Sequence, residues 1–171
     1  MNLNKTLKSL AGEFAVLSQL ALRGLDANMT LGNTKNVDIL VSDPVKNKMY
    51  KLEVKTRCKQ PIVKSRVFGN NFEWHMSKKH ETIIDKNLFY CFVDISGDTN
   101  IFRFFIIPSK VVANYVKKEH QAYLKNNPKN KDNDMRMFRL AAEKRACIFP
   151  SIELAKYENN WGFKTIVSSG V

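Results

Sequence analysis

Two stretches between residues 36 and 57 alternate apolar and polar positions with the period of a β-strand. Residues 37–42 and residues 50–57 each place apolar side chains at every second position. A period of two predicts strands that each turn one face toward a core. The segment 43–48 between them contains Pro44 and Asn47, which favour a turn. We therefore expect a β-hairpin over residues 36–57.

The register of this hairpin brings two acidic residues face to face. A turn centred between Val45 and Lys46 places Asp38 opposite Glu53, and directly opposed residues have Cβ atoms roughly 4.5–5.5 Å apart. Two carboxylates at that spacing repel each other unless a positive charge lies between them. A hard divalent cation such as Mg²⁺ takes oxygen ligands of this kind. Lys55 projects from the same face, where it would orient a water or stabilise charge on a phosphate. The alternative is an exposed sheet face whose charges meet only water.

The rest of the chain alternates between helical and strand patterns. Apolar residues at helical spacing, followed by Gly24, predict an amphipathic helix over residues 5–23, and a short strand follows at 26–31. Dense apolar runs joined by a turn predict two buried strands. Together these elements predict a mixed central sheet with helices against its faces. Further predictions are buried strands at 88–95 and 101–107, irregular structure at 57–75, helices at 77–86, 110–125 and 151–159, and either a strand or a helix at 135–149.

The acidic pair and its surroundings carry a family resemblance. Asp38 is followed, after fourteen residues, by Glu53-Val54-Lys55. This arrangement resembles the active-site signature of the PD-(D/E)XK nuclease superfamily, to which restriction endonucleases and archaeal Holliday-junction resolvases belong. That signature is an acid on one strand and acid-any-Lys on the next, usually with an acid on a preceding helix. Asn36-Val37 stands where a proline often precedes the aspartate, which is one of the looser positions. The resemblance covers residues 5–108.

The resemblance implies both a fold and an activity. The fold is α/β, with a restriction-endonuclease-like core whose mixed central sheet is flanked by helices in the order α-β-β-β-α-β. The activity is divalent-metal-dependent hydrolysis of DNA phosphodiester bonds by an endonuclease. Asp38, Glu53 and the backbone carbonyl of Val54 would hold Mg²⁺ or Mn²⁺, while Lys55 would position the attacking water. Family behaviour also implies a homodimer, because cutting two strands at one site generally uses two active sites.

Glu13 lies on the flank of the apolar stripe of the first predicted helix, about 80° from its centre. In the resemblance it matches the helix acid, which assists metal or water binding and counts among the catalytic residues. The alternative is a surface glutamate beside a core stripe. By length, residues 1–171 form a single domain. We expect its core at 5–108 and a helical extension at 109–171.

The charge of the chain points to a polyanionic partner. Lysine and arginine number 28 against 16 acidic residues, a net charge of +12, which favours nucleic acid or an anionic membrane. Mere solubility is the alternative explanation. The helical segments lack a strongly basic face opposite a large apolar one, so we expect DNA and no membrane partner. Three cysteines without a C-x-x-C spacing argue against a disulfide framework and a zinc site. We expect an intracellular, cytoplasmic protein.

Basic residues gather after the hairpin. Between Lys46 and Lys79 there are ten lysines or arginines and two acids, a composition that suits a phosphate backbone. Lys78 and Lys79 would stand at a helix N-terminus, where an anion docks favourably. Ordinary solvated lysines are the alternative. The predicted nucleic-acid contacts are Lys35, Arg57, Lys59, Lys64, Arg66, Lys78 and Lys79. The second functional hypothesis is a non-catalytic nucleic-acid-binding module with the same fold.

Overall fold

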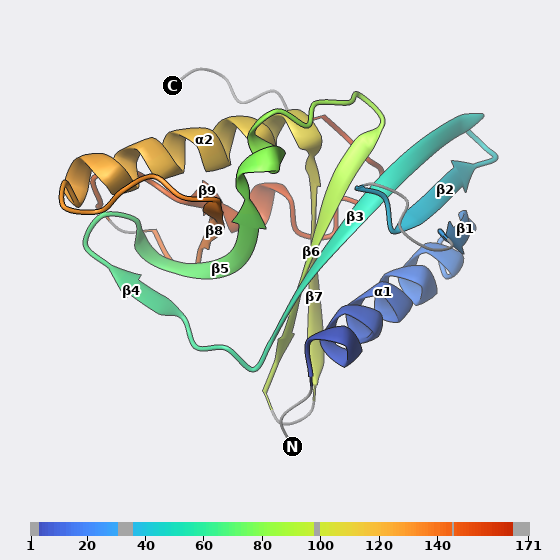
Figure 1. Cartoon of the computed structure of the whole chain (residues 1–171). Helices are drawn as coiled ribbons and strands as arrows, with labels where there is room; N and C mark the ends of the chain where they lie inside the picture. The colour runs from blue at the N-terminus through green and yellow to red at the C-terminus, as the bar shows by residue number, and fades with distance from the viewer. Residues whose placement is uncertain (1–3, 31–35, 98–99, 145, 166–171) are drawn as a thin grey trace. The chain divides into compact units, whose positions relative to one another are not determined.

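The structure is a computed structural model that describes residues 4–30, 36–97, 100–144 and 146–165. The chain divides into two compact units. The first unit comprises residues 1–59, 86–108 and 156–171, and the second comprises residues 60–85 and 109–155. Figure 1 shows the elements of both units along the chain. The single domain expected for residues 1–171 stays a prediction.

The first unit holds a five-stranded sheet in the order β1-β2-β3-β6-β7. β3 and β6 are parallel, and every other neighbouring pair in this sheet is antiparallel. The sheet is therefore mixed, as predicted. Its strands and the helix of this unit are α1 (Lys5–Ala21), β1 (Asp26–Met29), β2 (Ile39–Asp43), β3 (Lys48–Cys58), β6 (Leu88–Ser96) and β7 (Ile101–Pro108).

Helix α1 forms where the sequence predicts it. The Asn4 side chain caps its first turn by accepting a hydrogen bond from the backbone N–H of Leu7 at 2.8 Å. At the other end, Gly24 has φ of +69° and the N–H of Leu25 bonds to the carbonyl of Leu20 at 3.2 Å. This left-handed ending stops the helix at Ala21 rather than at residue 23.

The core of the first unit lies between α1 and the sheet. Val16 and Leu20 of α1 are fully buried in one cluster with Leu52, Val54 and other residues of the sheet. Because strand side chains alternate between faces, the odd-numbered residues of β3 point away from this cluster. The face of β3 opposite α1 therefore carries the charged residues Glu53, Lys55 and Arg57.

The second unit holds a four-stranded sheet in the order β4-β5-β8-β9. The pair β8–β9 is parallel and the other two pairs are antiparallel. Helix α2 packs on β8 of this sheet. The elements are β4 (Val63–Ser65), β5 (Gly69–Ser77), the 3₁₀ helix η1 (Lys78–Glu81), α2 (Ser109–Asn126), β8 (Met135–Ala141) and β9 (Ile152–Glu153), with the 3₁₀ helix η2 (Leu154–Lys156) after them.

Three predictions about this part of the chain are wrong. Residues 57–75 are not irregular, because β4 and β5 form a hairpin there. The helix predicted for 77–86 is only the single turn η1, and the β-branched run Thr82-Ile83-Ile84 that follows disfavours a longer one. The order α-β-β-β-α-β therefore fails at its second helix.

The extension at 109–171 is not uniformly helical either. It contains α2, but β8 and β9 follow, and the helix predicted for 151–159 is replaced by β9 and η2. Ile152 pairs with Leu140 of β8, and this pairing holds the segment extended. Among the described residues, no helix is long and apolar enough to cross a membrane.

Candidate functional site

The hairpin of β2 and β3 has the predicted register. Ile39 pairs with Leu52 and Val41 with Tyr50. Asp38 directly precedes β2, and its backbone N–H donates to the carbonyl of Leu52, the residue that pairs with Ile39, at 2.8 Å. The paired residues of β2 begin at Ile39, so the opposition of Asp38 and Glu53 stays a prediction.

The carboxylate of Asp38 is held against the edge of β3. Its Oδ2 accepts a hydrogen bond from the backbone N–H of Val54 at 2.7 Å. The N–H and C=O groups of one strand residue point toward the same neighbouring strand. The carbonyl of Val54 is therefore directed to the same edge of β3 as the Asp38 carboxylate.

Glu53 and Lys55 form an ion pair on the opposite face of β3 from α1. Lys55 Nζ lies 2.6 Å from Glu53 Oε1, a short charge-assisted hydrogen bond. Glu53 is only 4% exposed, whereas the Lys55 side chain is 27% exposed. Tyr90 lies beside Glu53 in the register of β3 and β6. Burial and, less strongly, the charge of Glu53 raise the pKa of the Tyr90 phenol.

Glu13 comes from α1 and belongs to the same neighbourhood. Ser9 donates its hydroxyl to Glu13 Oε1 at 3.1 Å. Burial raises the pKa of Glu13 above its ordinary value, the charge of Asp38 adds to this rise, and Ser9 and Lys55 oppose it. Glu13 thus lies close enough to Asp38 and Lys55 for both charges to act on it. The structure thus brings Asp38, Glu53 and Lys55 to adjacent positions along β3, whereas Glu13 on α1 is connected to Asp38 and Lys55 only by longer-range charge interactions.

A close contact between α1 and β3 holds Glu13 in place. A Cβ atom added at Gly12 would lie 1.9 Å from Thr56 Oγ1 and 3.0 Å from Thr56 Cβ. The helix therefore approaches the strand as closely as it does only because residue 12 has no side chain. The role of Gly12 was not predicted from the sequence. The available indication was a glycine inside a helical pattern, where glycine costs about 1 kcal/mol relative to alanine.

The donor groups fit a hard divalent cation. Asp38, Glu53 and the carbonyl of Val54 offer oxygen atoms, and Mg²⁺ is commonly held by one or two protein carboxylates with waters completing its shell. In the parts of the chain that the structure describes, no three or more His, Cys, Asp or Glu residues are grouped so that they could hold a metal ion.

Arg57 does not lie where a phosphate could reach it. Its side chain is 2% exposed, and Nε lies 2.8 Å from Oδ1 of the equally buried Asp94. The two residues are partners in the register of β3 and β6. This pairing corrects the expectation that Arg57 contacts nucleic acid. Asp94 was missed, although an acid inside the apolar run 88–95 was the available signal.

The other predicted nucleic-acid contacts are distributed over both units. Lys59 is exposed at the end of β3 in the first unit, and Lys35 lies outside the described residues. In the second unit, Lys64 and Arg66 are exposed and border one hollow of about 270 Å³. Lys78 and Lys79 are exposed on η1, where Lys78 pairs with Asp132 at 2.9 Å. The helix N-terminus expected at these two lysines is absent, because η1 is a single turn.

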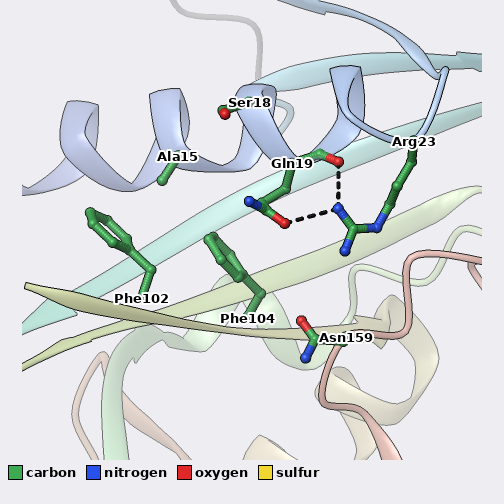
Figure 2. Close-up of a pocket in the computed structure, with 7 residues that line it drawn as sticks. All are labelled: Ala15, Ser18, Gln19, Arg23, Phe102, Phe104 and Asn159. Carbon is green, nitrogen blue, oxygen red and sulfur yellow. Dashed lines mark hydrogen bonds between the residues drawn. The ribbon is translucent and has the colours of Figure 1, made fainter.

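A hollow of about 630 Å³ lies on the α1 side of the first unit. Figure 2 shows the Phe102 and Phe104 rings side by side and the Arg23 guanidinium bonded to Gln19. Its lining contains none of the four catalytic candidates, so it is separate from the acidic site. The lining residues are Ala15, Ser18, Gln19, Arg23, Phe102, Phe104 and Asn159.

The fold is mixed α/β and is similar to that of a homing endonuclease. Among solved structures, a bacterial homing endonuclease, I-Ssp6803I, matches with a TM-score of 0.56 and 15% sequence identity. The match covers 93% of this chain and 89% of that chain. At this identity the likeness concerns the fold alone. No protein-family model and no curated protein sequence matches the chain.

Proposed function

We propose that this protein is a divalent-metal-dependent endonuclease of the PD-(D/E)XK type that hydrolyses phosphodiester bonds in DNA. The observation that carries the proposal is that the Asp38 carboxylate bonds to the backbone N–H of Val54, between Glu53 and Lys55, whose side chains form an ion pair. The similarity of the fold to that of a homing endonuclease supports the proposal. So does the net charge of +12, which suits a polyanionic substrate.

Each residue of the site has a distinct role in this proposal. The carboxylates of Asp38 and Glu53 and the carbonyl of Val54 hold Mg²⁺ or Mn²⁺. When bound, the cation lowers the pKa of a water and shields the charge of the scissile phosphate. Lys55 supplies a positive charge next to the position where negative charge develops on the phosphate. Glu13 orients water at the edge of the site.

DNA is the proposed partner because several basic side chains are exposed to solvent, where phosphates could reach them. Lys59 of the first unit and Lys64, Arg66 and Lys79 of the second unit are exposed. Such contacts are independent of sequence and weaken as salt rises. Lys78 also belongs to this set, although it already pairs with Asp132. A homodimer remains part of the proposal, since two active sites would cut both strands.

The test is a cleavage assay on supercoiled, linear, single-stranded and branched DNA, with Mg²⁺ or with a chelator. We expect the wild type to cut at least one DNA form only when Mg²⁺ is present. Glu53→Gln should lower the rate at least roughly 10²-fold, the usual loss when one electrostatic contact in an active site is removed. Glu153→Gln is the matched control, because Glu153 is exposed on β9, and it should cut as the wild type does.

Two results would contradict the proposal. Full activity in a folded Glu53→Gln protein would remove the carboxylate from catalysis. Binding of every DNA form with no cleavage of any, at the same affinity with and without Mg²⁺, would instead favour a non-catalytic nucleic-acid-binding module.

A further inference from the structure

We infer that Lys55 is the internal counter-ion of Glu53, and that a divalent cation binds this site by displacing the Lys55 ammonium group from the Glu53 carboxylate. The inference rests on the proposed function, because it concerns the same site. It assigns to Lys55 a role before catalysis: this residue sets how tightly the site takes its metal ion.

The geometry of the ion pair supports this role. Lys55 Nζ approaches Glu53 Oε1 to 2.6 Å, well inside hydrogen-bond distance. Glu53 is 4% exposed, so water neutralises little of its charge. Leaving a buried carboxylate without a compensating charge is costly, and the ammonium group of Lys55 provides that charge.

The same oxygen would be needed by a cation. A Mg²⁺ ion binds carboxylate oxygen at 2.0–2.1 Å, and an ammonium group in contact with that oxygen occupies one side of it. The two positive charges also repel each other at such a distance. The affinity of the site for a divalent ion is therefore reduced by the free energy required to separate Lys55 from Glu53.

Lys55 is placed to make this exchange. Its side chain is 27% exposed and carries the ammonium group on a flexible four-carbon stem. The ammonium group can therefore leave Glu53 while β3 stays folded. Asp38 is anchored differently, through the backbone N–H of Val54 at 2.7 Å. Once displaced, the ammonium group is available to a phosphate group bound at the site.

The test measures binding of Mn²⁺ alone, without DNA, by electron paramagnetic resonance of the free ion. Lys55→Met should bind Mn²⁺ roughly two- to tenfold more tightly than the wild type, the range expected when one competing ion pair is removed. The titration is made at the same pH, about 8, for every variant. Circular dichroism checks that the variant is folded.

Lys46→Met is the matched control. Lys46 also pairs with an aspartate, Asp43, at 2.8 Å on the same hairpin, and its side chain is 48% exposed at the turn. The control removes one positive charge from the hairpin but leaves Lys55 on Glu53. It should change Mn²⁺ affinity little, and less still at high salt, because mobile ions screen distant exposed charges. The effect of Lys55→Met should persist at the same salt concentration.

The outcomes of the Mn²⁺ titrations separate the counter-ion role of Lys55 from the proposed function. Equal or weaker Mn²⁺ binding by folded Lys55→Met would overturn the counter-ion role while leaving the metal site intact. A tightening of the same size in Lys46→Met would show that general charge, not local displacement, is responsible, and would also overturn it. Absence of Mn²⁺ binding by the wild type would overturn the proposed function together with this inference.

Discussion

Replacing Gly12 by alanine should disturb the contact that places Glu13 beside Asp38 and Lys55. The added methyl group would lie 1.9 Å from Thr56 Oγ1, whereas ordinary contacts begin at 3.4 Å. Rotation of the Thr56 side chain alone does not relieve the clash, because its Cβ atom does not move in such a rotation and stays at 3.0 Å. Helix α1 must therefore move away from β3.

The expected magnitude follows from two opposing terms. Overpacking of this kind costs about 1–3 kcal/mol. Alanine gains about 1 kcal/mol over glycine inside a helix. We therefore expect Gly12→Ala to lower the free energy of unfolding by roughly 0–2 kcal/mol. Because these two terms nearly cancel, the free energy of coupling between Gly12→Ala and a substitution of Thr56 is more informative than the stability of the single variant.

The assay is a double-mutant cycle measured by urea unfolding. In Gly12→Ala/Thr56→Ala the hydroxyl and methyl groups of residue 56 are absent, so the new methyl group has more room. The coupling between the two substitutions should favour the double variant by about 1–3 kcal/mol, within the range for residues in direct contact. Ser18→Ala, at an exposed position on α1, is the control and should be additive with Thr56→Ala.

Gly12→Ala should also change the environment of the Glu13 carboxyl group. Movement of α1 would take Glu13 from its present environment, and its raised pKa should fall toward the ordinary value of a glutamic acid, because burial is the largest cause of the rise. The reasoning would be refuted if Gly12→Ala stabilised the protein by about 1 kcal/mol, left the pKa of Glu13 unchanged, and showed no coupling to Thr56→Ala.

Two further predictions concern charged groups other than the four catalytic candidates. Arg57→Met should destabilise the fold by about 3–5 kcal/mol because it leaves Asp94 buried without its partner, and Arg57→Met/Asp94→Leu should recover most of this loss in urea unfolding. Burial raises the pKa of Asp94 although the positive charges of Arg57 and Arg103 oppose the rise. The ion pair itself therefore adds little to the free energy of unfolding, and the loss in Arg57→Met comes from the buried Asp94 charge that it leaves behind. An unchanged stability in Arg57→Met would contradict the assignment. Lys78 and His120 hold the pKa of Asp132 well below its ordinary value. The contribution of Asp132 to the free energy of unfolding is therefore present above about pH 4 and is lost as the pH falls further. Asp132→Asn should be less stable than the wild type at neutral pH and equally stable in strong acid, as measured by urea unfolding.

The hairpin of the candidate site could be predicted because its determinants are local. Pro44 and Asn47 mark the turn between the two predicted strands, and the apolar side chains of Ile39 and Val41, two positions apart, fix which face of the first strand is buried. A shift of one residue would expose every apolar side chain. The pairing of Ile39 with Leu52 and of Val41 with Tyr50 follows from these local constraints.

Other features depend on partners far along the chain. β5 pairs with β8, more than fifty residues later, through Asn71 to Ser77, and this pairing makes a strand of a segment whose sequence shows no strand period. The burial of Arg57 depends on the parallel pairing of β3 with β6, where no short turn sets the register. Patterns within a single segment carry no information about such pairings, which explains why β5 and the Arg57–Asp94 pair were missed.

The tightness of the α1–β3 packing could not be predicted either. A glycine at position 12 is compatible with a helix on a loosely or a closely packed sheet. The distinction depends on the position of Thr56 across the interface, which only the folded chain defines. By contrast, the end of α1 was close to its predicted place because Gly24 acts within its own segment.

The most direct test of the central claim is the rate at which Asp38→Asn cuts DNA in the presence of Mg²⁺. Asp26→Asn, at an exposed position on β1, is its control. If Asp38 and Glu53 together hold the cation, the rate for Asp38→Asn should fall at least roughly 10²-fold, and that for Asp26→Asn should equal the wild-type rate. Equal rates for wild type and folded Asp38→Asn would contradict the account.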